Sequence, residues 1–157
     1  MPTPLITSEG DLVYGWVRGG HASHPVPIGA SEVIKYASGK FVTNDASGRA
    51  EIAADGTATL WGHLECEEIT TSATEGAEVR NMIVDPSAVF RIPVNSGTYV
   101  ATMLGETCDL SVSSSIQGVQ LDASSEDTVR IVAGDVTNNY WVELMFVDAK
   151  RYNTGVV

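Results

Sequence analysis

The stretch Val89-Phe90-Arg91-Ile92-Pro93-Val94 gives the clearest indication of the fold. Its apolar second, fourth and sixth residues alternate with Arg91 and Pro93, and a period of two is expected of a β-strand with one buried face. Because proline has no backbone N–H to donate, we expect this strand to lie at a sheet edge or to end there. Residues 140–147 are apolar on both faces except at Glu143. They are expected to form a central strand or a strand at a subunit contact, and the central strand is favoured.

Runs of the same kind recur along the chain, separated by turns rich in Gly, Ser, Asn and Asp. The runs are dominated by Val, Ile, Tyr, Phe and Trp, which are enriched in strands. We expect further strands over residues 11–17, 32–36, 40–43, 50–53, 58–64, 79–84, 99–104, 108–112, 118–121 and 128–132. Most connections are short, which favours antiparallel neighbours. The sequence therefore predicts an all-β protein, built as a small antiparallel β-barrel or sandwich with the possibility of two β-subdomains.

Turn residues indicate which strands are joined as hairpins. Asp55-Gly56 lies between two strand-like runs, and this pair is typical of tight hairpin turns. It predicts that residues 50–53 pair with residues 58–64. Asn138-Asn139 and Asn95-Ser96-Gly97 indicate two further hairpins.

The chain divides into three parts by composition. Residues 1–30 hold Gly19-Gly20 and four of the six prolines, which favours an extended N-terminal arm. The balance of acidic and basic residues changes near residue 86, where we place a boundary between two units. Residues 31–85 are expected to form a β-rich subdomain, and residues 86–157 a β-barrel-like subdomain.

Charge restricts the classes of partner. The 157 residues include 9 Lys and Arg against 20 Asp and Glu, a formal net charge of −11. This excess repels phosphate backbones and anionic lipids, so we expect no nucleic acid and no membrane partner. No apolar run approaches the roughly 18 residues of a membrane helix. The first residues lack the pattern of a secretory signal, so we expect the protein to be made in a cytosol.

The spacing of histidine and cysteine gives weak candidates for a metal site. His21 and His24 lie three positions apart, but the surrounding glycines and prolines favour a solvated loop over a helix that would bring both rings to one face. We expect a structural hydrogen-bonding role for His63. Cys66 and Cys108 have no CxxC spacing and are expected to be reduced and mostly buried.

Two groups of acidic residues invite a cation-site or general-acid interpretation. The first follows a predicted strand and is expected to form a solvated rim, whereas the second lacks the calcium-loop pattern and is expected in a turn. The groups are Glu65, Glu67 and Glu68, and Asp122, Glu126 and Asp127. No motif of nucleophilic catalysis is present in the sequence. We therefore expect no enzyme activity, no catalytic residue, no metal and no cofactor.

The N-terminal arm carries an apolar group that would be costly to leave in water. Its members are Leu12, Val13, Tyr14, Trp16 and Val17. Such a group needs a partner surface, and we expect these residues to form a binding arm.

Two stretches resemble small β-rich head proteins of tailed bacteriophages. The first runs from Ile34-Lys35-Tyr36-Ala37-Ser38-Gly39-Lys40-Phe41-Val42 through Asp45-Ala46-Ser47-Gly48-Arg49-Ala50 to Asp55-Gly56-Thr57. The second runs from Gly105-Glu106-Thr107-Cys108-Asp109-Leu110 through Gly118-Val119-Gln120-Leu121-Asp122-Ala123-Ser124-Ser125 to Arg130-Ile131-Val132. Together they cover roughly a third of the chain, and they match in turns and strands.

The resemblance implies a capsid decoration (cement) protein. Proteins of this group sit outside the shell, often as homotrimers, and bridge neighbouring major capsid subunits. It implies that the protein is located on the capsid exterior of a virion, with the major capsid protein as its partner. It carries over no catalytic site.

A carbohydrate-binding or receptor-binding β-module, such as a head fibre component, is the alternative. Trp16, Trp61 and Trp141 could form a platform on which a sugar stacks. Exposure of two or more of these side chains on one face would favour this alternative. A metal-dependent enzyme is a third and weaker alternative.

Overall fold

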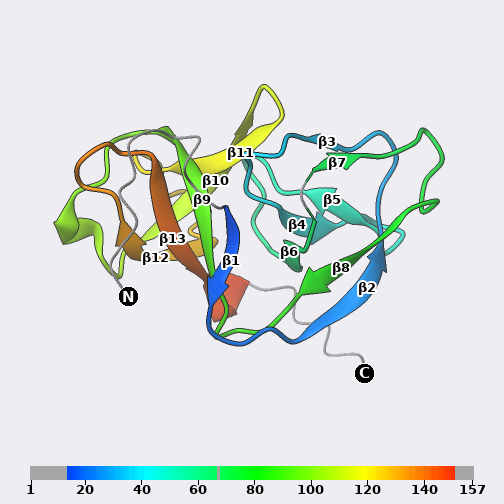
Figure 1. Cartoon of the computed structure of the whole chain (residues 1–157), viewed down its shortest axis with the longest axis horizontal. Helices are drawn as coiled ribbons and strands as arrows, with labels where there is room; N and C mark the ends of the chain where they lie inside the picture. Colours follow the sequence, from blue (N-terminus) through cyan, green and yellow to red (C-terminus); the bar gives the residue numbers. More distant parts are fainter. Residues whose placement is uncertain (1–13, 67, 151–157) are drawn as a thin grey trace.

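The computed structural model describes residues 14–66 and 68–150 and confirms an all-β protein. Strands fill both halves of the molecule, and the described part also contains two short 3-10 helices (Figure 1). The strands are β1 (Gly15–Arg18), β2 (Ser23–Pro27), β3 (Val33–Ile34), β4 (Phe41–Asn44), β5 (Ala50–Ile52), β6 (Gly62–Leu64), β7 (Ile69–Thr70), β8 (Val79–Ile83), β9 (Val89–Ser96), β10 (Thr107–Ser113), β11 (Ile116–Gln120), β12 (Val129–Gly134) and β13 (Trp141–Phe146). The 3-10 helices are η2 (Ala101–Met103) and η3 (Asp148–Lys150).

Strands β9 to β13 form a closed ring, here called the C-terminal barrel. The ring order is β9-β11-β10-β12-β13, and β13 pairs back onto β9. The pairing of β11 with β9 is parallel, whereas the other pairs are antiparallel. Inside lie alternate residues of the strands, among them Phe90, Ile92, Val142, Leu144 and Phe146. Phe90 and Ile92 of β9 are buried on the predicted face and Val94 packs half-buried against the same core, but Pro93, predicted on the other face, is buried as well.

Strands β2, β8, β6, β4 and β5 form a second small sheet, here called the N-terminal barrel. The order is β2-β8-β6-β4-β5. An isolated parallel bridge between Ile28 and Ala50 joins the two ends of this order, and the N–H of Gly29 donates to the Ala50 carbonyl at 2.9 Å. The β3–β7 pair forms a separate two-stranded sheet. The core of this half contains Val26, Ile28, Ile34, Val42, Ala50, Leu64, Ile69 and Met82.

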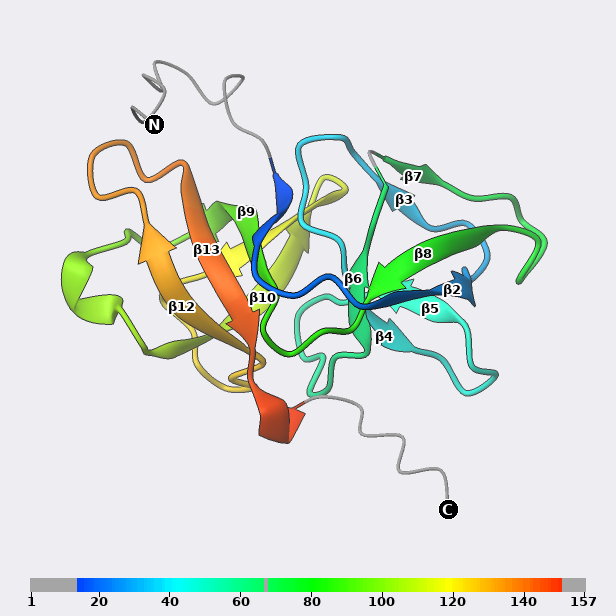
Figure 2. The ribbon, with the colours of Figure 1, turned by 60° about the horizontal axis from the view of Figure 1, so that its bottom comes forward.

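The two barrels lie side by side and share buried residues at their junction (Figure 2). Phe41 of β4 contacts Phe90 and Phe146 of the C-terminal barrel edge to face, with ring centroids 5.2 and 5.6 Å apart. Gln117 of β11 reaches across the junction and is fully buried. Its side-chain amide donates to the carbonyls of Phe41 and Ala53, both at 2.8 Å, and its oxygen accepts from the Phe41 N–H at 2.8 Å. The junction is thus packed around Phe41 and Gln117, and the amide nitrogen and oxygen of Gln117 both have partners there.

The prediction of an extended arm over residues 1–30 is wrong for the residues that the structure describes. β1 pairs with β9, and β2 pairs with β8, so both strands belong to sheets of their own chain. Val26 and Ile28 are buried in the N-terminal barrel. Prolines are compatible with β2 because this strand pairs in a ladder on one side only. Residues 1–13 lie outside the described part of the chain.

Three local predictions are also wrong. Asp55-Gly56 forms a turn, but β5 and β6 do not pair, because β4 lies between them and pairs with both. Residues 99–104 contain η2 in place of a strand, so Asn95-Ser96-Gly97 does not open a hairpin. The hairpin at Asn138-Asn139 is confirmed by the antiparallel pairing of β12 with β13.

Two predictions about individual strands have different outcomes. β13 is confirmed as a central strand, because it pairs with both β12 and β9. β9 is not an edge strand, because both of its edges are paired. One edge pairs with β13, and the other pairs first with β1 and then with β11. Pro93 lies between the residues that pair with β1 and those that pair with β11. The boundaries at residues 30 and 86 stay predictions.

Candidate functional site

β1 places the described part of the predicted binding arm at the outside of the C-terminal barrel. It pairs with β9 only, so its other edge has no strand partner in the described part of the chain. Trp16 is 40% exposed, and its ring meets that of His21 edge to face with centroids 4.9 Å apart. Tyr14 and Val17 are half-buried, whereas Leu12 and Val13 lie outside the described residues. The structure thus brings together three of the five predicted residues beside one free strand edge.

A pocket of about 370 Å³ lies next to β1, between the two barrels. We call it the junction pocket. Its walls come from β1, from the loop after β1, from Lys40 just before β4, from β6 and the residues after it, and from β8. The lining residues are Tyr14, Gly15, Trp16, His21, Lys40, His63, Leu64, Glu65, Cys66 and Ile83. No prediction from the sequence placed a site here, because the walls come from four distant parts of the chain.

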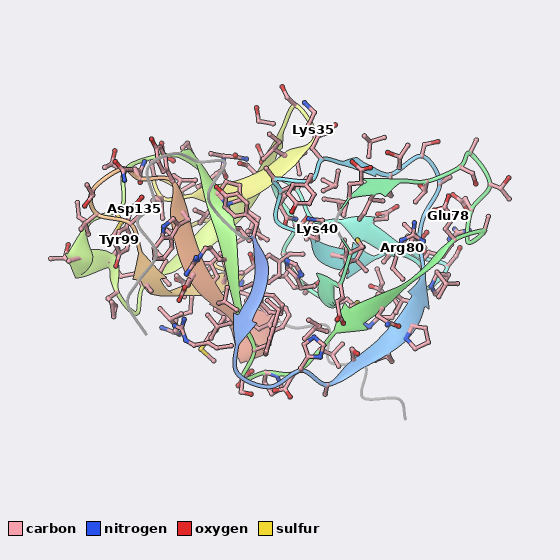
Figure 3. The ribbon with its side chains drawn as sticks, in the orientation of Figure 1. Lys35, Lys40, Glu78, Arg80, Tyr99 and Asp135 are labelled. Atoms are coloured by element: carbon pink, nitrogen blue, oxygen red, sulfur yellow. The ribbon has the colours of Figure 1, made fainter. Side chains whose placement is uncertain are left out.

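Lys40 is the most unusual residue of the junction pocket. It lies between the barrels and is only 3% exposed (Figure 3). Its ammonium donates to the carbonyl of Ser38 at 2.9 Å and to that of Tyr36 at 3.4 Å. No carboxylate of the described residues lies within ion-pair distance of it. Burial lowers the pKa of Lys40, and the nearby Cys66 thiol opposes this shift.

His63 on β6 forms the floor of the pocket and has the structural role predicted for it. Its Nε2 accepts from the backbone N–H of Lys40 at 3.1 Å, so Nδ1 carries the proton and donates to the Leu64 carbonyl at 2.8 Å. The ring stacks on Phe90 with centroids 4.3 Å apart. Burial lowers the pKa of His63 to about 3, and the Lys40 charge contributes to the shift. The imidazole is therefore a neutral core group at physiological pH.

The two cysteines are free thiols in different surroundings. Cys108 is buried in the C-terminal barrel, where burial raises the pKa of its thiol to about 12. Cys66 is half-buried and lines the junction pocket. Burial raises the pKa of the Cys66 thiol, against the opposing effect of Lys40. Neither thiol has the lowered pKa that marks a nucleophile.

The other two histidines do not form a pair. His21 is exposed at the rim of the pocket, and its Nε2 lies 3.3 Å from a carboxylate oxygen of Glu65. His24 lies on β2 and not in the predicted loop, with its ring edge toward Trp61 at a centroid distance of 6.4 Å. The glycines and prolines around His24 predicted a loop. The residues that make this segment a strand lie in β8, which is distant in sequence and could not be recognised as its partner.

The acidic groups are used in local structure where they are described. Asp127 accepts from the hydroxyl of Thr107 at 2.8 Å, and Asp122 accepts from that of Ser96 at 2.6 Å. Glu67 lies outside the described residues. Across residues 14–66 and 68–150, no three His, Cys, Asp or Glu side chains are grouped so that they could hold a metal ion. In the same part of the chain, no helix has the length and apolar character needed to cross a membrane.

The tryptophans lie in three separate places. Trp16 is exposed on β1, and Trp61 is half-buried beside β2. Trp141 is half-buried on the outer face of β13, where the Arg91 guanidinium lies 4.4 Å from its ring centre. This arrangement gives no shared platform for a sugar.

A charged cluster covers the outer face of the C-terminal barrel next to β1. Glu143 of β13 is almost fully buried and accepts from Arg91 of β9 at 2.7 Å and from Arg18 of β1. The carboxylate therefore links three neighbouring strands. The two arginines satisfy its charge, which holds β1 on the barrel.

No family model, no curated protein and no solved structure matches the chain.

Proposed function

We propose that the protein is a structural virion protein that binds the outside of a phage capsid. In this role it bridges neighbouring major capsid subunits and stabilises the shell, without catalysis, metal or cofactor. Support comes from the two stretches that resemble small head proteins of tailed phages. They lie in strands and turns of both barrels, around β4 and β5 and from β10 to β12.

The observation that carries the proposal is the outer edge of β1, which has no strand partner among residues 14–66 and 68–150. An unpaired strand edge offers a row of backbone donors and acceptors that an extended partner segment can join. Trp16 is exposed beside this edge, and large aromatic side chains dominate the energetics of many protein interfaces. The salt bridge of Arg18 to Glu143 ties β1 to β13 in addition to its pairing with β9, and a strand that is placed before it binds loses less entropy on binding.

A head-binding assay with point variants tests this role. We expect Trp16→Ala to weaken binding to purified phage heads at least about tenfold, because it removes an aromatic anchor from the contact. Val136→Ala is the matched control, since Val136 is also exposed but lies on the loop between β12 and β13. Bound protein per head is measured by sedimentation as a function of free concentration. Equal affinity of wild type and Trp16→Ala, with both folded, would rule out β1 as the contact.

Assembly state is a separate expectation of the same proposal. We propose a homotrimer, as the resemblance implies. Light scattering should give about three times the chain mass of 16.6 kDa. A monomer at all concentrations would contradict a trimer in solution and would leave the capsid to impose the symmetry.

A further inference from the structure

The junction pocket contains a buried cation without a counter-charge. Lys40 is 3% exposed, and the two acceptors of its ammonium are carbonyl oxygens. An ammonium group has three donors, so one remains without an acceptor among the described residues. A charge taken out of water is costly unless an opposite charge pairs with it. Lys40 therefore either gives up its proton or takes a counter-ion from outside the chain.

The space needed for such a counter-ion is present. The junction pocket has a volume of about 370 Å³, which falls within the range of sites for small molecules, about 300 to 1,000 Å³. Lys40 lines it together with three apolar or aromatic residues, Trp16, Leu64 and Ile83. This combination of one buried charge with apolar and aromatic walls is typical of a ligand site.

We propose that the junction pocket binds a small organic monocarboxylate, whose carboxylate pairs with Lys40 and whose apolar body contacts Trp16, Leu64 and Ile83. This inference does not rest on the capsid role, because the pocket is defined by its own walls.

The charges around the pocket favour a monoanion over a phosphate. Lys40 is the one buried cation in the lining, and His21 is already paired with the Glu65 carboxylate at the rim. A dianion would meet the Glu65 charge with only one cation to balance it. The net charge of −11 adds to this repulsion.

Ligand binding would also connect the two barrels. Trp16 belongs to β1 on the C-terminal barrel, whereas Leu64 and Ile83 belong to β6 and β8 of the N-terminal barrel. A ligand that fits between these walls binds the folded chain and not the unfolded chain. It therefore raises the melting temperature in proportion to the logarithm of its concentration once the site is nearly saturated.

Benzoate is the probe, because it combines one carboxylate with an apolar ring. We expect benzoate to shift the Trp16 indole N–H signal in NMR spectra and to raise the melting temperature of the full chain. Benzamide has the same shape without the charge, and we expect it to bind at least about tenfold more weakly, since a buried cation would stay unpaired. Inorganic phosphate should not compete with benzoate at equal concentration.

The variants Lys40→Met and Lys35→Met separate the pocket from general charge. Lys35 is exposed at the top of the molecule in the view of Figure 3 and does not line the junction pocket. We expect Lys35→Met to bind benzoate as the wild type does and Lys40→Met to lose at least about tenfold in affinity. If Lys40→Met does not fold, the comparison of benzoate with benzamide on the wild type decides the question.

Three results would overturn the proposal. Benzamide that binds as tightly as benzoate would show that no charge is recognised. Phosphate that competes as well as benzoate would show that the site takes any anion. A site with a dissociation constant of about 1 mM is about nine-tenths filled at about 10 mM benzoate. The absence of an NMR shift at that concentration would show that the pocket does not bind benzoate with even millimolar affinity. Each of these outcomes is independent of whether the protein binds phage heads.

Discussion

The variant Gln117→Leu should have a free energy of unfolding at least about 2 kcal/mol lower than that of the wild type. Gln117 is fully buried, and its side chain makes three hydrogen bonds of 2.8 Å to the backbone of Phe41 and Ala53. Leucine has a similar size but neither donor nor acceptor. It would leave the Phe41 N–H and the Ala53 carbonyl buried without the partner that Gln117 supplies, whereas the Phe41 carbonyl keeps its bond from the Ala53 N–H at 2.9 Å. Each group that loses its partner costs about 1 to 3 kcal/mol.

Urea unfolding measures this loss, and Gln120→Leu is the control. Gln120 lies on the same strand, β11, and is only half-buried. We expect its replacement to change the free energy of unfolding by less than about 0.5 kcal/mol. If the free energy of unfolding of Gln117→Leu lies within about 0.5 kcal/mol of the wild-type value, the Gln117 amide does not stabilise the junction between the barrels.

The position of Gln117 also shows what pattern alone could not predict. A glutamine in a short strand that holds a second glutamine looks like an outward-facing residue, and nothing near it in sequence indicates a partner. Its partners lie 64 and 76 positions away, on the other barrel. Tertiary contacts decide its role, and they arise only when the two barrels come together.

Strands with one buried face were predictable because their signal is local. The alternation in β9 and the two apolar faces of β13 follow directly from the sides that each strand buries. The Asn138-Asn139 hairpin was predictable for the same reason, since a turn fixes the pairing of its two flanks when nothing comes between them. At Asp55-Gly56 the turn forms as well, but β4 takes the place beside β5.

The candidate site was less predictable than the fold. Trp16 was identified from its apolar neighbours, and the structure places it at the rim of the junction pocket. Lys40 was assigned only to the start of a strand. Its burial depends on walls supplied by β1, β6 and β8, and no residue next to Lys40 in sequence signals them. A pocket whose walls come from distant segments has no local sequence motif by which it could be predicted.

His63 should make the free energy of unfolding begin to fall near pH 6.5, above the pH at which ordinary carboxylates titrate. Its ordinary pKa of 6.5 falls to about 3 in the folded protein, because burial between Phe41 and Phe90 disfavours the charged ring. Between these two pH values the unfolded chain binds a proton that the folded chain does not. Stability is therefore complete above pH 6.5 and is lost as the pH falls toward 3. At a pH of about 4.5 the loss from this residue alone is about 3 kcal/mol.

Comparison with His63→Gln isolates this effect. Glutamine can replace both hydrogen bonds of the ring but does not titrate, so we expect a less stable variant at neutral pH with a flatter decline into acid. Two carboxyl groups have pKa values shifted in opposite directions: burial raises the pKa of Glu32, and the backbone N–H of Arg49 lowers that of Asp45. Both are common to the two proteins and cancel in the difference. His24→Gln makes the same substitution at an exposed histidine and serves as the control for the substitution itself. Chemical denaturation at pH 7 and 4.5 gives the result, and parallel declines of wild type and His63→Gln would show that the buried imidazole is not the group that takes up the proton.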